Sequence, residues 1–299
     1  MTQFYEKLIP VIVIFFLGFC LKKLGIFRKE DGDRFLKLSF YVTLPAITFL
    51  AISNVQLKLE FIYLPFIAMA NVFIVYFIAL LAAKRFHFTK AARGTYLIAA
   101  MIMNTGFTLP FLIAAFNQQG LALYTIFDFG NVLLIFTFIY YVAIRHGKNS
   151  SAKIDPKKFL HLPPLWALVL GFIFNIANLP IPSIANNFLD ILGSPTIPLI
   201  MISLGIYFSP KLINLDKISS VLFIRIGIGF LLGLAFVNIL NLQGIIRTVV
   251  IVCSAAPVGY NTLVFASLEE LDKEFAASLV SFSILLGILY IPVLIFFFS

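Results

Sequence analysis

The sequence contains few charged residues. Only 12% of its 299 residues are Asp, Glu, Lys or Arg, whereas 61% are hydrophobic and the mean hydropathy is +1.04. Soluble domains carry about 25% charged residues, so this composition excludes an ordinary soluble protein. The apolar runs are roughly 18 to 25 residues long and lack the strict alternation of barrel strands. The composition therefore predicts an all-α integral membrane protein.

Cysteine and histidine are also scarce. Cys20 and Cys253 lie in separate apolar runs with no C-x-x-C pattern, so we expect both to be core residues and not a disulfide or metal site. The three histidines lie in or beside predicted loops, which argues against a buried metal cluster or a histidine-based triad: His87, His146 and His161. No phosphate-binding G-x-x-x-x-G-K-[ST] occurs. We expect no enzyme activity, no metal and no cofactor.

Ten apolar segments are long enough to cross a bilayer. A first run preceded by Glu6 and Lys7, with no small-residue cleavage site after it, is predicted to be a span and not a signal peptide. The predicted transmembrane helices cover residues 4–21, 35–52, 61–83, 94–116, 121–144, 162–179, 184–208, 218–240, 245–268 and 275–298.

Basic residues gather in alternate loops, after spans one, three, five and seven. By the positive-inside rule these loops face the cytoplasm and both termini lie outside a cell (inner) membrane. The formal net charge is +9, but it is distributed over short loops and forms no basic domain or stripe. We therefore expect the lipid bilayer as a partner, and no nucleic acid.

An internal repeat relates the two halves of the chain. A shift of about 153 residues superposes prolines, glycines and threonines in three separate spans, whereas chance matching of apolar residues would favour Leu and Ile. Each half has five spans, an odd number, so the second half enters the membrane in the opposite direction. This predicts a 5+5 inverted repeat: residues 1–144, a cytoplasmic linker 145–160, and residues 161–299. The matched pairs include Pro10 with Pro163, Thr43 with Thr196, Pro45 with Pro198, and Gly106 with Gly259.

Spans four and nine carry residues that interrupt helices. Residues 104–110 and 254–262 combine proline, glycine and side chains that compete for backbone hydrogen bonds. Each break exposes the positive N-terminus of the following half-helix, which suits an anion. Alternatively, the polar groups only satisfy the broken backbone. The predicted substrate-binding residues are Asn104, Thr105, Gly106, Thr108, Pro110, Pro257, Gly259, Tyr260, Asn261 and Thr262, with Thr108 expected as an N-cap and Asn104 and Asn261 as the main contacts.

An ionisable residue within span five, Asp128, predicts a functional role because a charge in the membrane is costly. It either carries a coupling proton or forms a structural ion pair with Arg225 of span eight. Asn131 completes this set of coupling candidates. Asp190, early in span seven, is expected to be solvated or interfacial.

Four motifs together resemble the auxin efflux carrier family in its compact prokaryotic form, which is related to the bile acid/sodium symporter superfamily. The motifs are YVTLPA at 41–46, NTGF at 104–107 with Pro110, D-x-G-N at 128–131, and A-P-x-x-x-N at 256–261. The resemblance implies a scaffold of spans 1, 2, 6 and 7 and a moving transport domain of spans 3–5 and 8–10. It also implies that spans four and nine cross at Pro110 and Pro257, beside Asn104 and Asn261.

The sequence and this resemblance predict a secondary active or facilitated transporter of a small organic anion, such as an auxin-like mono- or dicarboxylate. The resemblance implies an elevator-like motion and a homodimer. A proton is the first candidate for coupling, and sodium, as in bile-acid symporters, is the second. A membrane ligand sensor is the alternative from another functional class.

Overall fold

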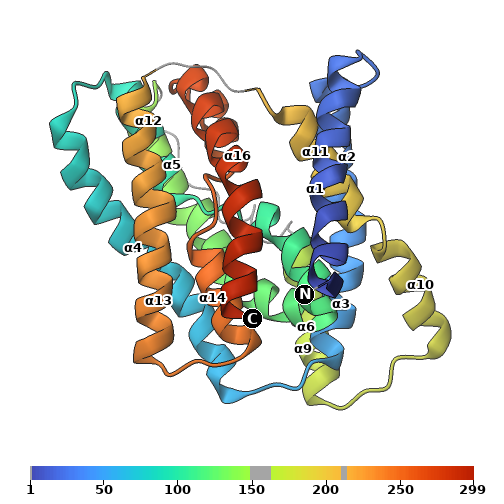
Figure 1. The fold of residues 1–299 in the computed structure, drawn as a ribbon. Coiled ribbons are helices and arrows are strands. Elements are labelled where there is room, and N and C mark those ends of the chain that lie inside the picture. Colours follow the sequence, from blue (N-terminus) through green and yellow to red (C-terminus); the bar gives the residue numbers. More distant parts are fainter. Residues whose placement is uncertain (1, 149–162, 210–213) are drawn as a thin grey trace. The chain divides into compact units, whose positions relative to one another are not determined.

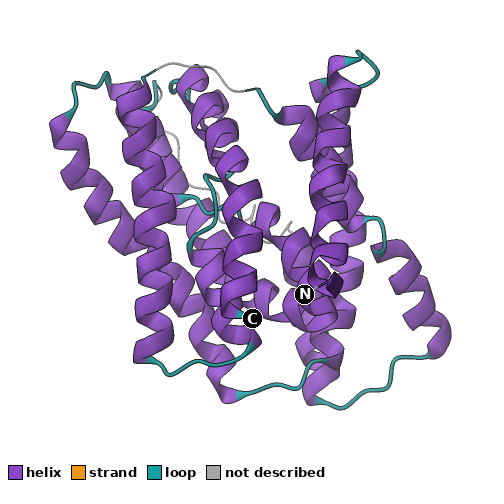
Figure 2. Cartoon of the chain, viewed as in Figure 1, coloured by secondary structure: helices purple, strands orange, loops and turns teal. Residues whose placement is uncertain are grey.

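The computed structural model describes residues 2–148, 163–209 and 214–299. Among these residues the regular structure is helical, without a strand, and a single isolated antiparallel bridge joins Met103 to Val258 (Figure 2). The prediction of an all-α chain is confirmed for the described residues. The predicted linker from residue 149 onward, and the start of the second repeat at 161 and 162, lie outside them.

The first half contains seven α-helices, joined in places by short π and 3₁₀ turns. They are α1 (Thr2–Lys23), α2 (Lys29–Leu38), α3 (Leu44–Asn54), α4 (Tyr63–Ala82), α5 (Lys90–Met101), α6 (Thr105–Leu134) and α7 (Tyr140–His146). Two π-helical turns, η1 (Ser39–Thr43) and η4 (Ile135–Ile139), connect α2 to α3 and α6 to α7.

Helix α6 is divided at Asn117. This residue has φ 52° and ψ −139°, which no helix accommodates, and Asn is among the few non-glycine residues that tolerate a positive φ. The run from Thr105 to His146 has 42 residues. As one straight helix it would be about 63 Å long, twice the thickness of a bilayer core. The kink at Asn117 instead separates a short helix before it from a longer one after it.

The second half contains eight α-helices in its described part. They are α9 (Pro163–Ile176), α10 (Ser183–Gly193), α11 (Thr196–Tyr207), α12 (Leu215–Leu222), α13 (Gly229–Ile239), α14 (Ile245–Ser254), α15 (Asn261–Leu268) and α16 (Lys273–Phe298). The π-helical turn η5 (Phe223–Ile228) joins α12 to α13.

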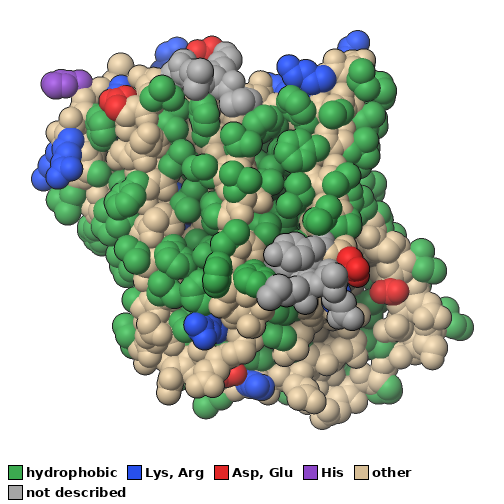
Figure 3. Space-filling view, in the orientation of Figure 1, with side chains coloured by type: hydrophobic (Ala, Val, Ile, Leu, Met, Phe, Trp, Pro, Cys, Tyr) green, Lys and Arg blue, Asp and Glu red, His purple; other side chains and the backbone are tan. Residues whose placement is uncertain are grey.

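Many helices present large apolar side chains on their surfaces. Ile184 is 86% exposed, Ile239 77% and Phe66 63%, and hydrophobic side chains cover most of the face shown in Figure 3. Such surfaces are stable in lipid and not in water. The helices α9 and α14 are apolar but shorter. Six helical runs among the described residues are long and apolar enough to cross a membrane: Lys29–Asn54, Leu59–Arg85, Thr105–His146, Ser183–Tyr207, Leu215–Ile239 and Lys273–Phe298.

The chain divides into two compact units, and each unit takes segments from both halves. The first unit comprises residues 1–61, 109–126 and 160–208. Within it α1 packs along α11, and α3 packs against α9 and α10 (Figure 1). The α1–α11 contact is close because of Gly205, where a Cβ would lie 2.1 Å from the carbonyl oxygen of Phe15.

The second unit comprises residues 62–108, 127–159 and 209–299. Here α5 packs against α4, α7 and α16, and α14 packs against α13 and α16. The helices α5 and α14 are mostly buried, and the C-terminal ends of both lie inside the protein. One core prediction fails elsewhere: Cys253 on α14 is buried, but Cys20 near the end of α1 is exposed. An apolar run in a membrane helix can face outward as well as inward.

Candidate functional site

Two short non-helical segments of the second unit pair with each other. Residues 102–104 connect α5 to α6, and residues 255–260 connect α14 to α15. The Asn104 N–H donates to the carbonyl of Pro257 at 2.8 Å, and the Gly259 N–H donates to the carbonyl of Ile102 at 2.9 Å. Met103 and Val258 form the antiparallel bridge between these two bonds. This pairing, which we call the crossover, therefore brings the starts of α6 and α15 together.

Asn104 organises the start of α6. Its side-chain oxygen accepts a hydrogen bond from the Phe107 N–H at 3.1 Å, and its Nδ2 donates to the carbonyl of Val258 at 3.3 Å. Asn104 is thus the N-cap and also ties α6 to the opposite segment. The predicted N-cap, Thr108, is wrong, because Thr108 is helical and its hydroxyl donates to the carbonyl of Thr105 at 2.8 Å.

Helix α6 begins at Thr105, within the stretch 104–110 that we predicted to be interrupted. Pro110 lies inside α6, among residues that belong to the first unit. A proline removes one intrahelical hydrogen bond but does not prevent a helix that is already capped upstream.

At the start of α15 the polar side chains do not act as caps. Tyr260 occupies the N-cap position without a capping hydrogen bond from its side chain. The half-buried Asn261 amide makes no hydrogen bond within the described residues, and the hydroxyl of Thr262 is buried there without a partner. Asn261 and Thr262 are therefore polar groups at a helix N-terminus whose side chains find no hydrogen-bond partner in the described part of the protein.

The two glycines that the predicted repeat pairs, Gly106 and Gly259, differ in their surroundings. A Cβ on Gly259 would lie 2.2 Å from Cγ2 of Ile102, so only glycine permits the two segments to pair this closely. A Cβ on Gly106 would have Asn104 Oδ1, 3.9 Å away, as its only neighbour within 4 Å. Open space therefore lies beside Gly106 in the first turn of α6, whose leading N–H groups have no carbonyl partner within the helix.

A carboxylate lies beside the start of α6. Asp128 Oδ1 accepts hydrogen bonds from the hydroxyl of Thr105 at 2.7 Å and from Nδ2 of Asn131 at 2.8 Å. Asn131 is 1% exposed, and its Oδ1 has no partner among the described residues. Asp128 and Asn131 are thus joined directly to the first residue of α6.

The contacts of Arg225 differ from those that one of our two hypotheses predicted. Its guanidinium is fully buried and donates to the carbonyls of Ala100, Met101 and Ser254 and to the side-chain oxygen of Asn71. The hypothesis of an ion pair with Asp128 is wrong for the described residues. The carbonyls at the ends of two buried helices attract the guanidinium instead.

Three residues that the sequence analysis did not select complete the crossover. Ser283 on α16 accepts from the Val258 N–H at 3.0 Å, Tyr290 on α16 donates to the carbonyl of Ala255 at 2.6 Å, and Asn71 on α4 accepts from Arg225. Asn71 lies in the middle of an apolar span, and a polar residue in that position is a signal that sequence analysis can use. The serine and tyrosine carry no comparable signal.

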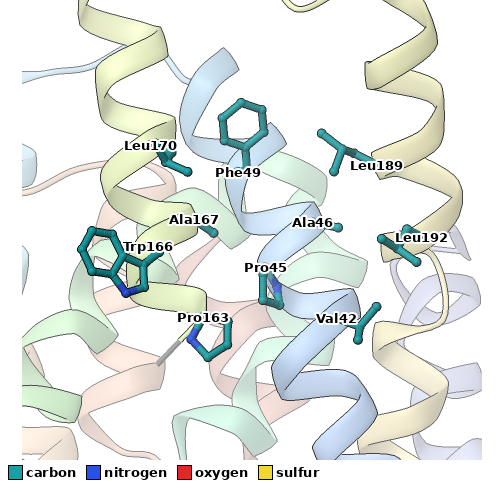
Figure 4. Close-up of a pocket in the computed structure, with 10 residues that line it drawn as sticks. All are labelled: Val42, Pro45, Ala46, Phe49, Pro163, Trp166, Ala167, Leu170, Leu189 and Leu192. Carbon is teal, nitrogen blue, oxygen red and sulfur yellow. The ribbon is translucent and has the colours of Figure 1, made fainter. Parts of the chain in front are cut away.

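Two cavities lie among the described residues of the first unit, and neither is lined by a residue of the crossover. One has a volume of about 470 Å³ and an apolar lining (Figure 4): Val42, Pro45, Ala46, Phe49, Pro163, Trp166, Ala167, Leu170, Leu189 and Leu192. The other, of about 200 Å³, includes Asp190, Asn117, Gln118 and Ser194 in its lining. Asp190 thus borders a cavity that apolar side chains also line, and it is exposed, as expected of a solvated residue.

Comparison with known proteins identifies the family. Residues 3–158 and 148–295 match the family described as "Membrane transport protein". The chain belongs to this family, which is of the auxin efflux carrier type. It is 30% identical over 285 residues to an uncharacterized transporter of Methanocaldococcus jannaschii, covering 91% of this chain and 92% of the relative. It is 27% identical over 292 residues to an uncharacterized transporter of Methanothermobacter thermautotrophicus, covering 96% of both chains. This membrane transport protein is a multi-pass protein and not an enzyme.

Proposed function

We propose that this membrane transport protein is a secondary transporter of a small organic anion, bound where α6 and α15 begin. The main observation in support is the crossover pairing. Asn104, the N-cap of α6, donates hydrogen bonds to the carbonyls of Val258 and Pro257, which lie just before α15. Helix N-termini carry positive partial charge and unpaired N–H groups. Two of them at one place favour an anion such as a mono- or dicarboxylate.

The accessible polar groups support the same location. Gly106 and Asn261 are both partly exposed, and Asn261 has an amide available for a ligand. In this proposal Asn104 holds the geometry, Asn261 contacts the anion with the buried Thr262 beside it, and the N–H groups of Thr105 and Gly106 face its charge. Thr108, Pro110, Pro257, Gly259 and Tyr260 shape the two helix starts.

Asp128 is the proposed coupling residue, with Asn131 as its support. Because Asp128 accepts a hydrogen bond from Thr105, its negative charge competes with a bound anion for the start of α6. Protonation of Asp128 would remove that repulsion. Anion and proton then bind together, which is the basis of proton-linked transport.

We further propose ten spans in a 5+5 inverted repeat with interrupted spans four and nine. Two helix contacts support this: α1 packs on α11, and α3 packs on α9. The repeat pairs span one with span six and span two with span seven, so these contacts are equivalent under it. The excess of basic residues in alternate loops supports cytoplasmic loops and external termini in the cell membrane.

An elevator-like motion of a transport domain against a scaffold is part of the proposal. The division into two compact units supports it, because the spans expected to form the scaffold, one, two, six and seven, fall in the first unit. That unit also includes residues 109–126 of α6. A homodimer formed through the scaffold is the proposed assembly.

Ligand-induced thermal stabilisation of the detergent-purified protein tests the binding site. The panel contains mono- and dicarboxylates with neutral analogues as controls, applied to the parent and to Asn261→Ala. Asn187→Ala is the matched control, because Asn187 is an exposed helical asparagine without a side-chain hydrogen bond among the described residues. We expect carboxylates to raise the melting temperature of the parent and of Asn187→Ala but not of Asn261→Ala.

Stabilisation by neutral compounds alone, or an equal response of all three proteins, would contradict the proposed anion site. Uptake of the stabilising carboxylate into sealed proteoliposomes then separates a transporter from a membrane sensor, since a sensor binds without accumulation.

A further inference from the structure

Arg225 is a buried cation without a buried anion beside it. The residue is 0% exposed, and no carboxylate lies within ion-pair distance of its guanidinium in the described parts of the chain. An unpaired buried charge is costly unless surrounding dipoles compensate it. The protein must therefore supply that compensation from neutral groups.

Four neutral oxygens do so. Arg225 Nη1 donates to the carbonyls of Ala100 at 3.2 Å and Met101 at 3.4 Å, and Nη2 donates to the carbonyl of Ser254 at 2.5 Å and to Asn71 Oδ1 at 2.9 Å. The three carbonyls belong to the last two residues of α5 and the last residue of α14. Helix C-termini carry negative partial charge, so two dipoles converge on the guanidinium.

This set of ligands is typical of a small alkali cation. Carbonyl and amide oxygens suit hard monovalent cations, and in transporters the C-terminal ends of interrupted helices coordinate the coupling ion. We propose that the Arg225 guanidinium is a built-in replacement for such an ion, so that anion transport by this protein requires no sodium. The inference rests on the proposed transport function and opposes the sodium-coupled alternative.

The surrounding sequence is adapted to the guanidinium. Arg225 lies in the π-helical turn η5, a distortion often found at functional positions. Gly229 is needed next to it, since a Cβ there would lie 2.6 Å from Arg225 Nη2 and 2.2 Å from the carbonyl oxygen of Ser254. Tyr290 takes the next carbonyl, that of Ala255, so the guanidinium and the tyrosine together satisfy the end of α14.

Removal of the side chain creates an empty four-oxygen site, which cations alone can probe. Thermal unfolding of Arg225→Ala is measured in choline, sodium, potassium and millimolar guanidinium chlorides at equal ionic strength, without substrate. We expect Arg225→Ala to unfold at least about 5 °C below the parent in choline, because buried carbonyls lose their donors. Guanidinium, and to a lesser extent sodium or potassium, should restore part of this shift.

Two further variants make the result specific. Arg247→Ala removes an exposed arginine of the same unit, whose guanidinium lies 5.2 Å from the ring centre of Phe298, and should show no cation-specific recovery. Arg225→Lys keeps the positive charge and should unfold closer to the parent than Arg225→Ala does. Equal melting temperatures of Arg225→Ala in all four salts would overturn the inference.

The parent protein supplies an independent test if Arg225→Ala does not fold. Carboxylate stabilisation and proteoliposome uptake are compared in sodium and choline chloride. We expect equal responses in both, and a requirement for sodium would overturn the inference. The absence of any carboxylate response in either salt would contradict the proposed anion site instead, so the two failures are distinguishable.

Discussion

The hydroxyl oxygens of Thr43 and Thr196 lie 2.8 Å apart in a buried hydrogen bond, and the two residues are separated by 153 positions. This separation equals the offset that superposes the two halves of the sequence. Under the proposed repeat each threonine contacts its own equivalent, as residues next to a two-fold pseudo-axis would. Thr43 directly precedes α3, and Thr196 is the first residue of α11.

A double-mutant cycle on this pair measures the contact. Thr43→Val and Thr196→Val should each lower the free energy of unfolding by about 0.5–1.5 kcal/mol, since each removes one side of a buried hydrogen bond. The double variant should lose less than the sum of the two. Thr48→Val is the control on α3, because the Thr48 hydroxyl is buried without a partner in the described structure and its loss should be neutral or stabilising. Strict additivity would show that the two hydroxyls do not interact.

The two glycines at the crossover should respond oppositely to alanine. Gly259→Ala forces a Cβ against Ile102 and should destabilise the protein by about 1–3 kcal/mol. Gly106→Ala meets open space and should leave stability unchanged or raise it by up to about 1 kcal/mol. Thermal unfolding of both variants tests this, and similar melting temperatures would contradict the close pairing of the two segments. Any carboxylate response lost in the stable Gly106→Ala would place the ligand at the start of α6.

Alanine substitutions of the two predicted substrate contacts, Asn104 and Asn261, should affect the stability of the protein differently. Asn104→Ala removes the cap of α6 and the bond to Val258, so it should cost about 0.5–2 kcal/mol. Asn261→Ala removes no hydrogen bond of the described structure and should cost less than about 0.5 kcal/mol. Unfolding without ligand measures both, and a larger loss in Asn261→Ala would contradict the assignment of Asn104 as the structural member of the pair.

Asp128→Asn tests proton coupling while it keeps an acceptor for the hydrogen bonds from Thr105 and Asn131. The amide oxygen of Asn still accepts from Thr105 and Asn131, but the residue carries no exchangeable charge. We expect uptake into proteoliposomes to lose its response to a pH gradient while the anion still binds. Asp216→Asn, an exposed aspartate at the start of α12, should leave that response intact. An unchanged gradient response in Asp128→Asn would exclude Asp128 as the proton carrier.

Composition and short motifs alone determined the class of this protein. Long apolar runs require helices in a membrane because no water is present there to satisfy the backbone, and the motifs at 41–46, 104–110, 128–131 and 256–261 identified the transporter family. These are local properties of the chain. The polar residues near the centres of the spans, Asn104, Asp128 and Asn261, stood out for the same reason.

Only the tertiary structure decided which groups these polar residues contact. Asn104 caps α6 in place of Thr108, and Arg225 binds the ends of α5 and α14 and not Asp128. Both residues also bind a group that is distant in the sequence: the carbonyl of Ala100 lies 125 residues from Arg225, and the carbonyl of Val258 lies 154 residues from Asn104. A charge in an apolar helix predicts that a partner exists, but carbonyl oxygens at helix ends compete with carboxylates for it. Which of them is within reach depends on how the helices pack, and this is not encoded in any single segment.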